Sequence, residues 1–195
     1  MPSAEDGPES FRRIGERARF DGGFFRVVTG TFVAPTGFTF ERTILRHPGA
    51  VCAVPLESDG RHVLMVRQYR AAVEEPILEL PAGKRDVDYE DPKTCIAREL
   101  VEEIGRRPGR ITEIARFVNS PGISDETTLC YLAEELVECE REAHGIEEEH
   151  MTIERIALGE IEDLIAAGEL VDAKSIIALY AARSTLAGRR PSASP

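Results

Sequence analysis

The segment that decides the fold runs from Gly83 to Gly105 and reads GKRDVDYEDPKTCIARELVEEIG. Its second half carries the signals of one helix. Asp91 suits the N-cap, Pro92 the first helical position and Gly105 the C′ position. Apolar residues recur along it at spacings of three and four: Ile96, Ala97, Leu100, Val101 and Ile104. The segment therefore predicts an amphipathic helix between Asp91 and Gly105.

Three glutamates share one face of this helix. Glu99, Glu102 and Glu103 are spaced i, i+3 and i+4, which places neighbouring Cβ atoms about 5–6 Å apart. Like charges at this spacing destabilise an isolated helix, and a hard divalent cation would offset the repulsion. Charge runs are more often plain solvated surface, so the three glutamates alone leave both interpretations open.

The complete pattern resembles the Nudix box, in which a glycine, a spacer and a glutamate lead into Arg-Glu-aliphatic-x-Glu-Glu-x-Gly. The matching positions are Glu90, Arg98, Glu99, Leu100, Glu102, Glu103 and Gly105. Six residues rather than five separate Gly83 from Glu90, and Arg106 stands where an aliphatic residue is usual. Neither departure removes a carboxylate, so the resemblance implies a metal-dependent hydrolase.

Segments outside the box narrow the resemblance to the ADP-ribose pyrophosphatases. They are Glu79–Gly83 (ELPAG), Ser120-Pro121-Gly122 with Pro121 fifteen residues past Arg106, and Gly168–Lys174 (GELVDAK). The resemblance implies hydrolysis of ADP-ribose to AMP and ribose 5-phosphate. The first alternative is the same reaction on GDP-mannose or a UDP-sugar. The second, a non-catalytic ADP-ribose sensor, is disfavoured by the complete set of glutamates and by the lack of a basic DNA-binding extension.

The same resemblance implies roles for individual residues. The metal ligands would be Ala82 through its carbonyl, Glu99, Glu103 and Glu149, holding Mg²⁺ or, as a substitute, Mn²⁺. The catalytic residues would be Glu147, Glu102 and Arg98, with Glu147 as general base and Glu148 as the fallback if the register slips by one. The substrate-binding residues would be Phe24, Phe25, Arg42, Arg70, Ser120, Pro121, Gly122 and Glu126.

Side-chain chemistry supports part of this substrate set. Arginine presents a planar fork of donors that suits phosphate oxygens, although a solvated arginine at a strand end is the plain alternative. The resemblance implies substrate contact by Arg42 and Arg70 and leaves Arg46 unassigned. Phe24 and Phe25 are equally compatible with adenine stacking and with packing in a strand. Related enzymes often carry a glutamate where Thr43 stands, so recognition of the base stays open there.

The interleaved strands and helices predict an α/β (α+β) protein with a mixed β-sheet and a small N-terminal antiparallel β-unit. The resemblance implies the Nudix fold, with the mixed sheet between helices. The expected strands are 24–32, 38–46, 51–56, 62–69, 77–80, 111–118, 127–136 and 151–158, and the further helices are 161–167 and 173–186. Strands 51–56 and 62–69 are expected to pair around the turn at 58–60. The expected domains are tails at 1–12 and 188–195, a β-subdomain at 13–47 and a hydrolase domain at 48–187.

Composition limits the partners and the compartment. The 195 residues carry a net charge of −11, which disfavours nucleic acid as a partner. No apolar run approaches a membrane span and the N-terminus is too polar for a secretory signal, so we expect a cytoplasmic protein. The four cysteines lack a CxxC pair and the four histidines lack ligand spacing, which predicts reduced thiols, surface histidines and no zinc site. The resemblance adds a homodimer with exchanged N-terminal strands.

Overall fold

The computed structural model describes residues 9–87, 89–142 and 145–189. The chain divides into an N-terminal unit, residues 1–49 with 118–126, and a main unit, residues 50–117 with 127–195. Most of the two predicted tails lies outside the described residues. The described part of the chain already forms a strand at Arg12, and its last helix continues to Arg189, so regular structure extends further toward both ends than expected.

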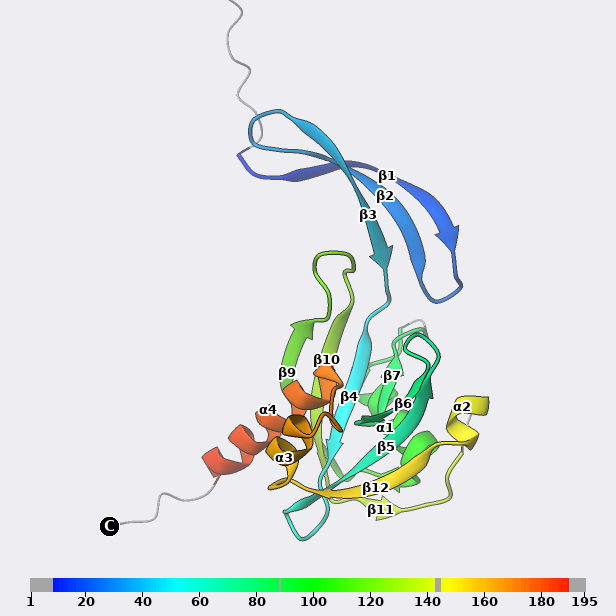
Figure 1. The fold of residues 1–195 in the computed structure, drawn as a ribbon, viewed down its shortest axis with the longest axis vertical. Coiled ribbons are helices and arrows are strands. Elements are labelled where there is room, and N and C mark those ends of the chain that lie inside the picture. Colours follow the sequence, from blue (N-terminus) through cyan, green and yellow to red (C-terminus); the bar gives the residue numbers. More distant parts are fainter. Residues whose placement is uncertain (1–8, 88, 143–144, 190–195) are drawn as a thin grey trace, which may run out of the picture. The chain divides into compact units, whose positions relative to one another are not determined.

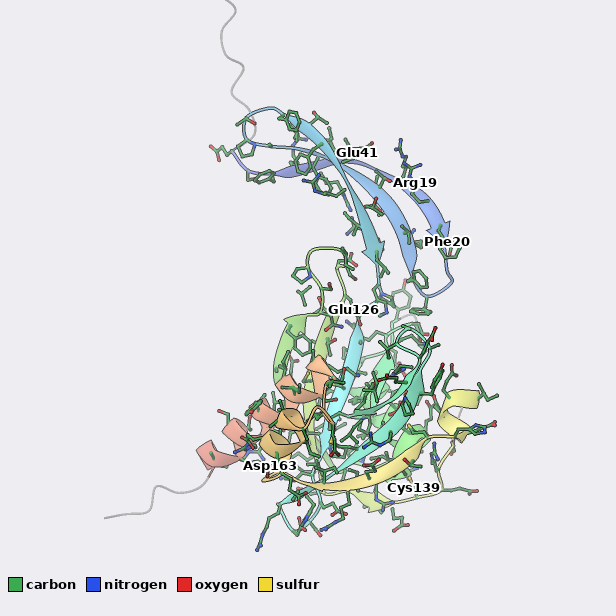
Figure 2. All side chains as sticks on the ribbon, in the orientation of Figure 1. Arg19, Phe20, Glu41, Glu126, Cys139 and Asp163 are labelled. Carbon is green, nitrogen blue, oxygen red and sulfur yellow. The ribbon has the colours of Figure 1, made fainter. Side chains whose placement is uncertain are left out.

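Within the described residues of the N-terminal unit, a three-stranded antiparallel sheet has the order β1-β2-β3 (Figure 1). Its strands are β1 (Arg12–Asp21), β2 (Arg26–Val33) and β3 (Thr39–Arg46). β2 and β3 confirm the predicted pair of strands. β1 was not predicted, because its sequence RRIGERARFD is mostly charged and lacks an alternating apolar face. It forms by pairing with β2, and Arg19 on β1 (Figure 2) donates a hydrogen bond of 2.8 Å to Thr29.

Among the described residues of the main unit, the strands form sheets with the orders β7-β4-β10-β9, β12-β5-β6 and β11-β8. Their bounds are Ala50–Pro55 (β4), His62–Arg70 (β5), Glu75–Glu79 (β6), Ala82–Lys84 (β7), Arg106–Arg107 (β8), Arg110–Val118 (β9), Thr127–Glu134 (β10), Val137–Glu138 (β11) and Thr152–Ala157 (β12). β4 and β10 are parallel, whereas β7 pairs antiparallel with β4, which makes the first sheet mixed.

The central strands are buried on both faces, and their side chains alternate between two apolar cores. One core lies against α3 (Ile161–Ala166) and α4 (Ala173–Arg189), and the other lies against α1 (Pro92–Ile104). From β4, Cys52 and Val54 enter the first core, whereas Val51 and Ala53 enter the second. This period of two follows from strand geometry, and each large side chain fully buried in this way contributes about 1.5–3 kcal/mol.

The predicted class is confirmed: an α+β protein with a mixed sheet between helices and an N-terminal antiparallel unit. One predicted pairing is wrong. The strands expected to form a hairpin around 58–60 share only one isolated bridge in the described structure, between Leu56 and Val63, and then diverge into separate sheets. Both strands are buried on both faces, so each takes other neighbours: β4 pairs with β7 and β10, and β5 pairs with β6 and β12.

Candidate metal and phosphate site

The helix that carries the glutamates begins and ends where its capping residues place it. The Asp91 side chain accepts a hydrogen bond from Lys93 N at 3.3 Å, and Pro92 occupies the first turn. At the other end Gly105 is left-handed, with φ 61°, and its N–H reaches the carbonyls of Leu100 and Val101. The predicted helix is therefore confirmed, and its apolar stripe packs into the second core.

Two of the three glutamates turn into the protein beside the loop that precedes the helix. Glu99 and Glu103 are 8% and 4% exposed. A Cβ atom on Gly83 would lie 2.1 Å from the Glu99 carboxylate, so the lack of a side chain there lets the carboxylate rest against the backbone. Glu103 accepts a hydrogen bond of 3.1 Å from the Ala82 N–H. The structure thus brings together Ala82, Gly83 and both carboxylates.

These two carboxylates are costly to ionise where they lie. Burial raises the pKa of Glu99 to about 7, although the Arg98 charge acts in the opposite direction. Burial also raises the pKa of Glu103 to about 8, and the neighbouring Glu99 charge adds to that shift. A hard divalent cation takes oxygen ligands and removes the repulsion between such carboxylates. The carboxylate oxygens of Glu99 and Glu103 therefore fit a divalent cation as ligands.

Arg98 forms ion pairs with three carboxylates at this helix face. Its guanidinium pairs with Glu90 at 3.2 Å, with Glu99 at 2.9 Å and with Glu102 at 2.9 Å. One arginine shared by three carboxylates fixes their orientation, because the planar fork restricts where each oxygen can lie. The structure therefore places predicted residues Arg98 and Glu102 in one cluster with Glu99, and it gives Arg98 an orienting position.

Arg70 lies at the end of β5 and near this cluster, since the Glu103 charge acts on its guanidinium. It forms a side-on pair with Glu79, through Nε–Oε1 at 2.8 Å and Nη2–Oε2 at 2.7 Å. Glu79 was not predicted as a site residue. The signal in the sequence is a glutamate within the otherwise apolar run 77–80, because a buried charge requires partners. The pKa of Glu79 is lowered, because Arg70 and Lys174 together outweigh the effect of burial.

The acidic run after Gly145 forms the short helix α2 (Ile146–Glu149), which contacts β5. Glu148 is half-buried, and its negative charge raises the pKa of both Glu99 and Glu103. Glu147 and Glu149 are exposed. The charge of Glu148 therefore acts on the carboxylate cluster, and the roles assigned to Glu147, Glu148 and Glu149 stay predictions.

The other predicted substrate residues belong to the N-terminal unit, where they contact one another and their neighbours. Phe24 packs edge-on against Phe25 with ring centroids 5.1 Å apart. The Arg42 guanidinium lies 4.7 Å from the centre of the Phe40 ring. Glu126, at the end of the loop after β9 (Figure 2), accepts a backbone hydrogen bond of 3.0 Å from Asn119. In the same loop the Ser120 carbonyl accepts from Ile123 N at 3.0 Å, which closes the turn that contains Pro121 and Gly122. Their substrate roles stay predictions.

A second acidic group lies at the start of β5. Among the described residues, Glu57, Asp59 and His62 bring one ligand atom each to within 4.8 Å of the others. The Arg155 guanidinium already pairs with Glu57 and, at 2.6 Å, with Asp59. Because a cation of the protein itself occupies this group, its composition is explained without a metal ion. His62 is therefore more closely partnered than a plain surface histidine.

Known proteins resemble this chain along most of its length. The NUDIX domain model matches residues 46–179. An ADP-ribose pyrophosphatase of Bacillus subtilis (strain 168) is 36% identical over 145 residues, which is 74% of this chain and 77% of that protein. An ADP-ribose pyrophosphatase of Mycobacterium tuberculosis (strain ATCC 25618 / H37Rv) is 33% identical over 179 residues, covering 91% of this chain and 86% of that protein.

A solved structure of an ADP compounds hydrolase has the same fold, with a TM-score of 0.81, 21% identity and coverage of 93% of this chain and 96% of that one. In the described part of this chain, no helix is long and apolar enough to cross a membrane. The cluster of Arg98, Glu99, Glu102 and Glu103 lies inside the matched range, on the residues that carry the Nudix box. The chain belongs to the NUDIX domain family.

Proposed function

We propose that this protein hydrolyses the diphosphate bond of ADP-ribose to AMP and ribose 5-phosphate, with Mg²⁺ as the cofactor and Mn²⁺ as a substitute. The observation that carries the proposal is the pair of buried carboxylates, Glu99 and Glu103, against Ala82 and Gly83. Two relatives that match most of the chain bear the name ADP-ribose pyrophosphatase, which supports the choice of substrate.

The reaction transfers a substituted phosphoryl group, that of AMP or that of ribose 5-phosphate, to water. Water attacks one phosphorus of the diphosphate, the bridging P–O bond breaks, and the proton of the water passes to a carboxylate of the protein. A bound divalent cation supplies charge stabilisation for the oxygens that become negative. Glu99 and Glu103, with the Ala82 carbonyl, would hold the cation, and Arg98 would orient them. Arg70 would bind phosphate oxygens, and an acid of α2 would take the proton.

ADP-ribose should be hydrolysed with a catalytic efficiency at least about 100-fold above that for nucleoside triphosphates or dinucleoside tetraphosphates. The loop that carries Pro121 is closed by its own backbone hydrogen bonds, so holding a compact terminal sugar would cost little ordering entropy. Steady-state kinetics on a panel of nucleotides with Mg²⁺, with products identified by mass, tests this. A higher catalytic efficiency on a triphosphate would contradict the choice of substrate but not the membership of the family. A preference for GDP-mannose or a UDP-sugar would indicate different recognition of the base, and Thr43 is the first residue to test for it.

The partner of the protein, besides its substrate, is proposed to be a second copy of the chain with exchanged N-terminal strands. The described part of the N-terminal unit leaves large apolar side chains exposed on and beside its sheet: Phe11, Ile14, Phe20 and Phe38. Exposed apolar side chains in this number favour an interaction surface. Light scattering after size exclusion should give twice the 21.5 kDa mass of the chain, and a monomer at micromolar concentration would contradict the proposal.

We also propose a cytoplasmic location. Cys52 and Cys130 lie directly opposite each other on β4 and β10, with their sulfur atoms 3.1 Å apart, and both are free thiols. In a reducing compartment this buried pair would stay as two thiols.

A further inference from the structure

Arg70 is the end of a chain of four alternating charges, Arg70, Glu79, Lys174 and Asp172. The mechanism proposed above gives no role to the last three. Glu79 pairs with Arg70 on one side and with Lys174 Nζ at 2.5 Å on the other, and Lys174 pairs in turn with Asp172 at 2.9 Å. The Glu79 side chain is 4% exposed, whereas that of Arg70 is 41% exposed. Lys174 and Asp172 are each 17% exposed, so Glu79 is the most buried member of the chain and Arg70 is the most exposed.

The start of α4 fixes Lys174 in place. Asp172 accepts hydrogen bonds from the Ser175 N–H at 3.0 Å and from the Ser175 hydroxyl, so it caps the helix while it pairs with Lys174. The Ser175 oxygen also accepts the N–H of Leu80 at 2.7 Å. The first turn of α4 is thus joined by an ion pair to Glu79, the last residue of β6, and by a hydrogen bond to Leu80, which follows it.

The geometry of the Arg70 pair leaves one side of the guanidinium available. Nε and Nη2 are both used by Glu79, and among the described residues Nη1 has no hydrogen-bond partner. A side-on pair fixes the plane of the guanidinium, because two parallel hydrogen bonds define it. Glu79 Oε2 accepts from Arg70 and from Lys174 together, so Lys174 restrains the same oxygen that sets the position of Arg70.

We propose that Lys174, held by Asp172, is a positioning residue that acts through Glu79 on Arg70 and so aims the Nη1 edge of Arg70 at the diphosphate of the substrate. This rests on the proposed function in that Arg70 binds phosphate oxygens. If Lys174 were only the counter-ion of the buried Glu79, its loss would lower the free energy of unfolding. It would then have no effect on kcat/KM that depends on Arg70.

The test is a double-mutant cycle on kcat/KM for ADP-ribose. Lys174→Met removes the charge at similar volume and should lower kcat/KM about 10- to 100-fold, since misplacing a phosphate-binding group is expensive. Arg70→Lys keeps the charge of Arg70 and loses its fork. In the Arg70→Lys background, Lys174→Met should have little further effect, because the residue through which Lys174 acts is already gone. Lys174→Arg should restore most of the activity. Equal losses in both backgrounds, or no loss from Lys174→Met, would overturn the proposal.

The matched control is Arg67→Met. Arg67 lies on β5, the strand that ends at Arg70, and its guanidinium pairs with Glu154 at 2.6 Å. Its side chain is 34% exposed. We assign it no role in the proposed site. Arg67→Met should match the wild type in kcat/KM.

If Lys174→Met does not fold, Asp172→Asn takes its place in the double-mutant cycle. Asparagine keeps an oxygen acceptor for Ser175 and loses the charge that holds Lys174.

A second readout does not depend on turnover. The ¹⁵Nε–Hε resonance of Arg70, assigned by its disappearance in Arg70→Lys, should exchange slowly with water in the wild type and much faster in Lys174→Met. Unchanged exchange would overturn the positioning role even if ADP-ribose is not the substrate. Conversely, a wild type that does not hydrolyse ADP-ribose, together with faster exchange in Lys174→Met, would contradict the proposed function and leave the positioning role standing.

Discussion

Glu103→Gln should lower the turnover of ADP-ribose by at least about 10²–10³-fold at saturating Mg²⁺, because a charged metal ligand that stabilises the transition state supplies several kcal/mol. Glutamine keeps the size of the side chain and its ability to accept the Ala82 N–H, so the fold should be unaffected. The measurement is steady-state kinetics at several metal concentrations. Turnover equal to that of the wild type would contradict the assignment of Glu103 as a metal ligand.

The same variant should be at least as stable as the wild type when no metal is present. The pKa of Glu103 is raised from its ordinary value of 4.5 to about 8. The unfolded chain therefore ionises this group at a lower pH than the folded protein does, and the free energy of unfolding falls as pH rises from about 4.5 to about 8. Glutamine does not ionise, so its advantage over the wild type should grow across this range. Urea unfolding in the presence of a chelator, at several pH values, checks the sign.

Glu148→Gln should lower kcat about 10²–10⁴-fold while leaving the affinity for the metal nearly unchanged, as expected for loss of a general base. The warrant is that Glu148 is half-buried and that its charge acts on both Glu99 and Glu103. Glu147→Gln and Glu149→Gln are the matched comparisons, because both side chains lie on the same short helix, are exposed and carry the alternative assignments.

The three variants together separate the two registers. A loss of activity confined to Glu147→Gln would restore the assignment made from the sequence. Full activity in all three variants would show that the acidic run is solvated surface and that another group accepts the proton.

The sequence predicted those features of the site that depend only on residues within one helix. The limits of α1 follow from Asp91, Pro92 and Gly105, and the spacing of Glu99 and Glu103 fixes their common face without reference to the rest of the chain. The strand β1 escaped prediction because its residues form a strand only by pairing with β2, which the sequence of β1 does not reveal.

The support of Arg70 escaped prediction for a related reason. Lys174 and Glu79 lie 95 residues apart, and only the packing of α4 beside the end of β6 brings them together. In α2 the resemblance assigned the base to Glu147 and a metal ligand to Glu149, with Glu148 as the fallback base, but three consecutive glutamates leave the register open. Which of them turns toward the carboxylate cluster depends on how the chain enters the helix after Gly145, and this is a tertiary property.

The central claim is that the buried carboxylates beside Gly83 bind a divalent cation, and anomalous X-ray scattering from crystals soaked in Mn²⁺ tests it most directly. The account predicts an anomalous peak in contact with Glu99 and Glu103. A peak only at Glu57, Asp59 and His62, where Arg155 now lies, or no peak beside Glu103 at a Mn²⁺ concentration that supports full turnover, would contradict it.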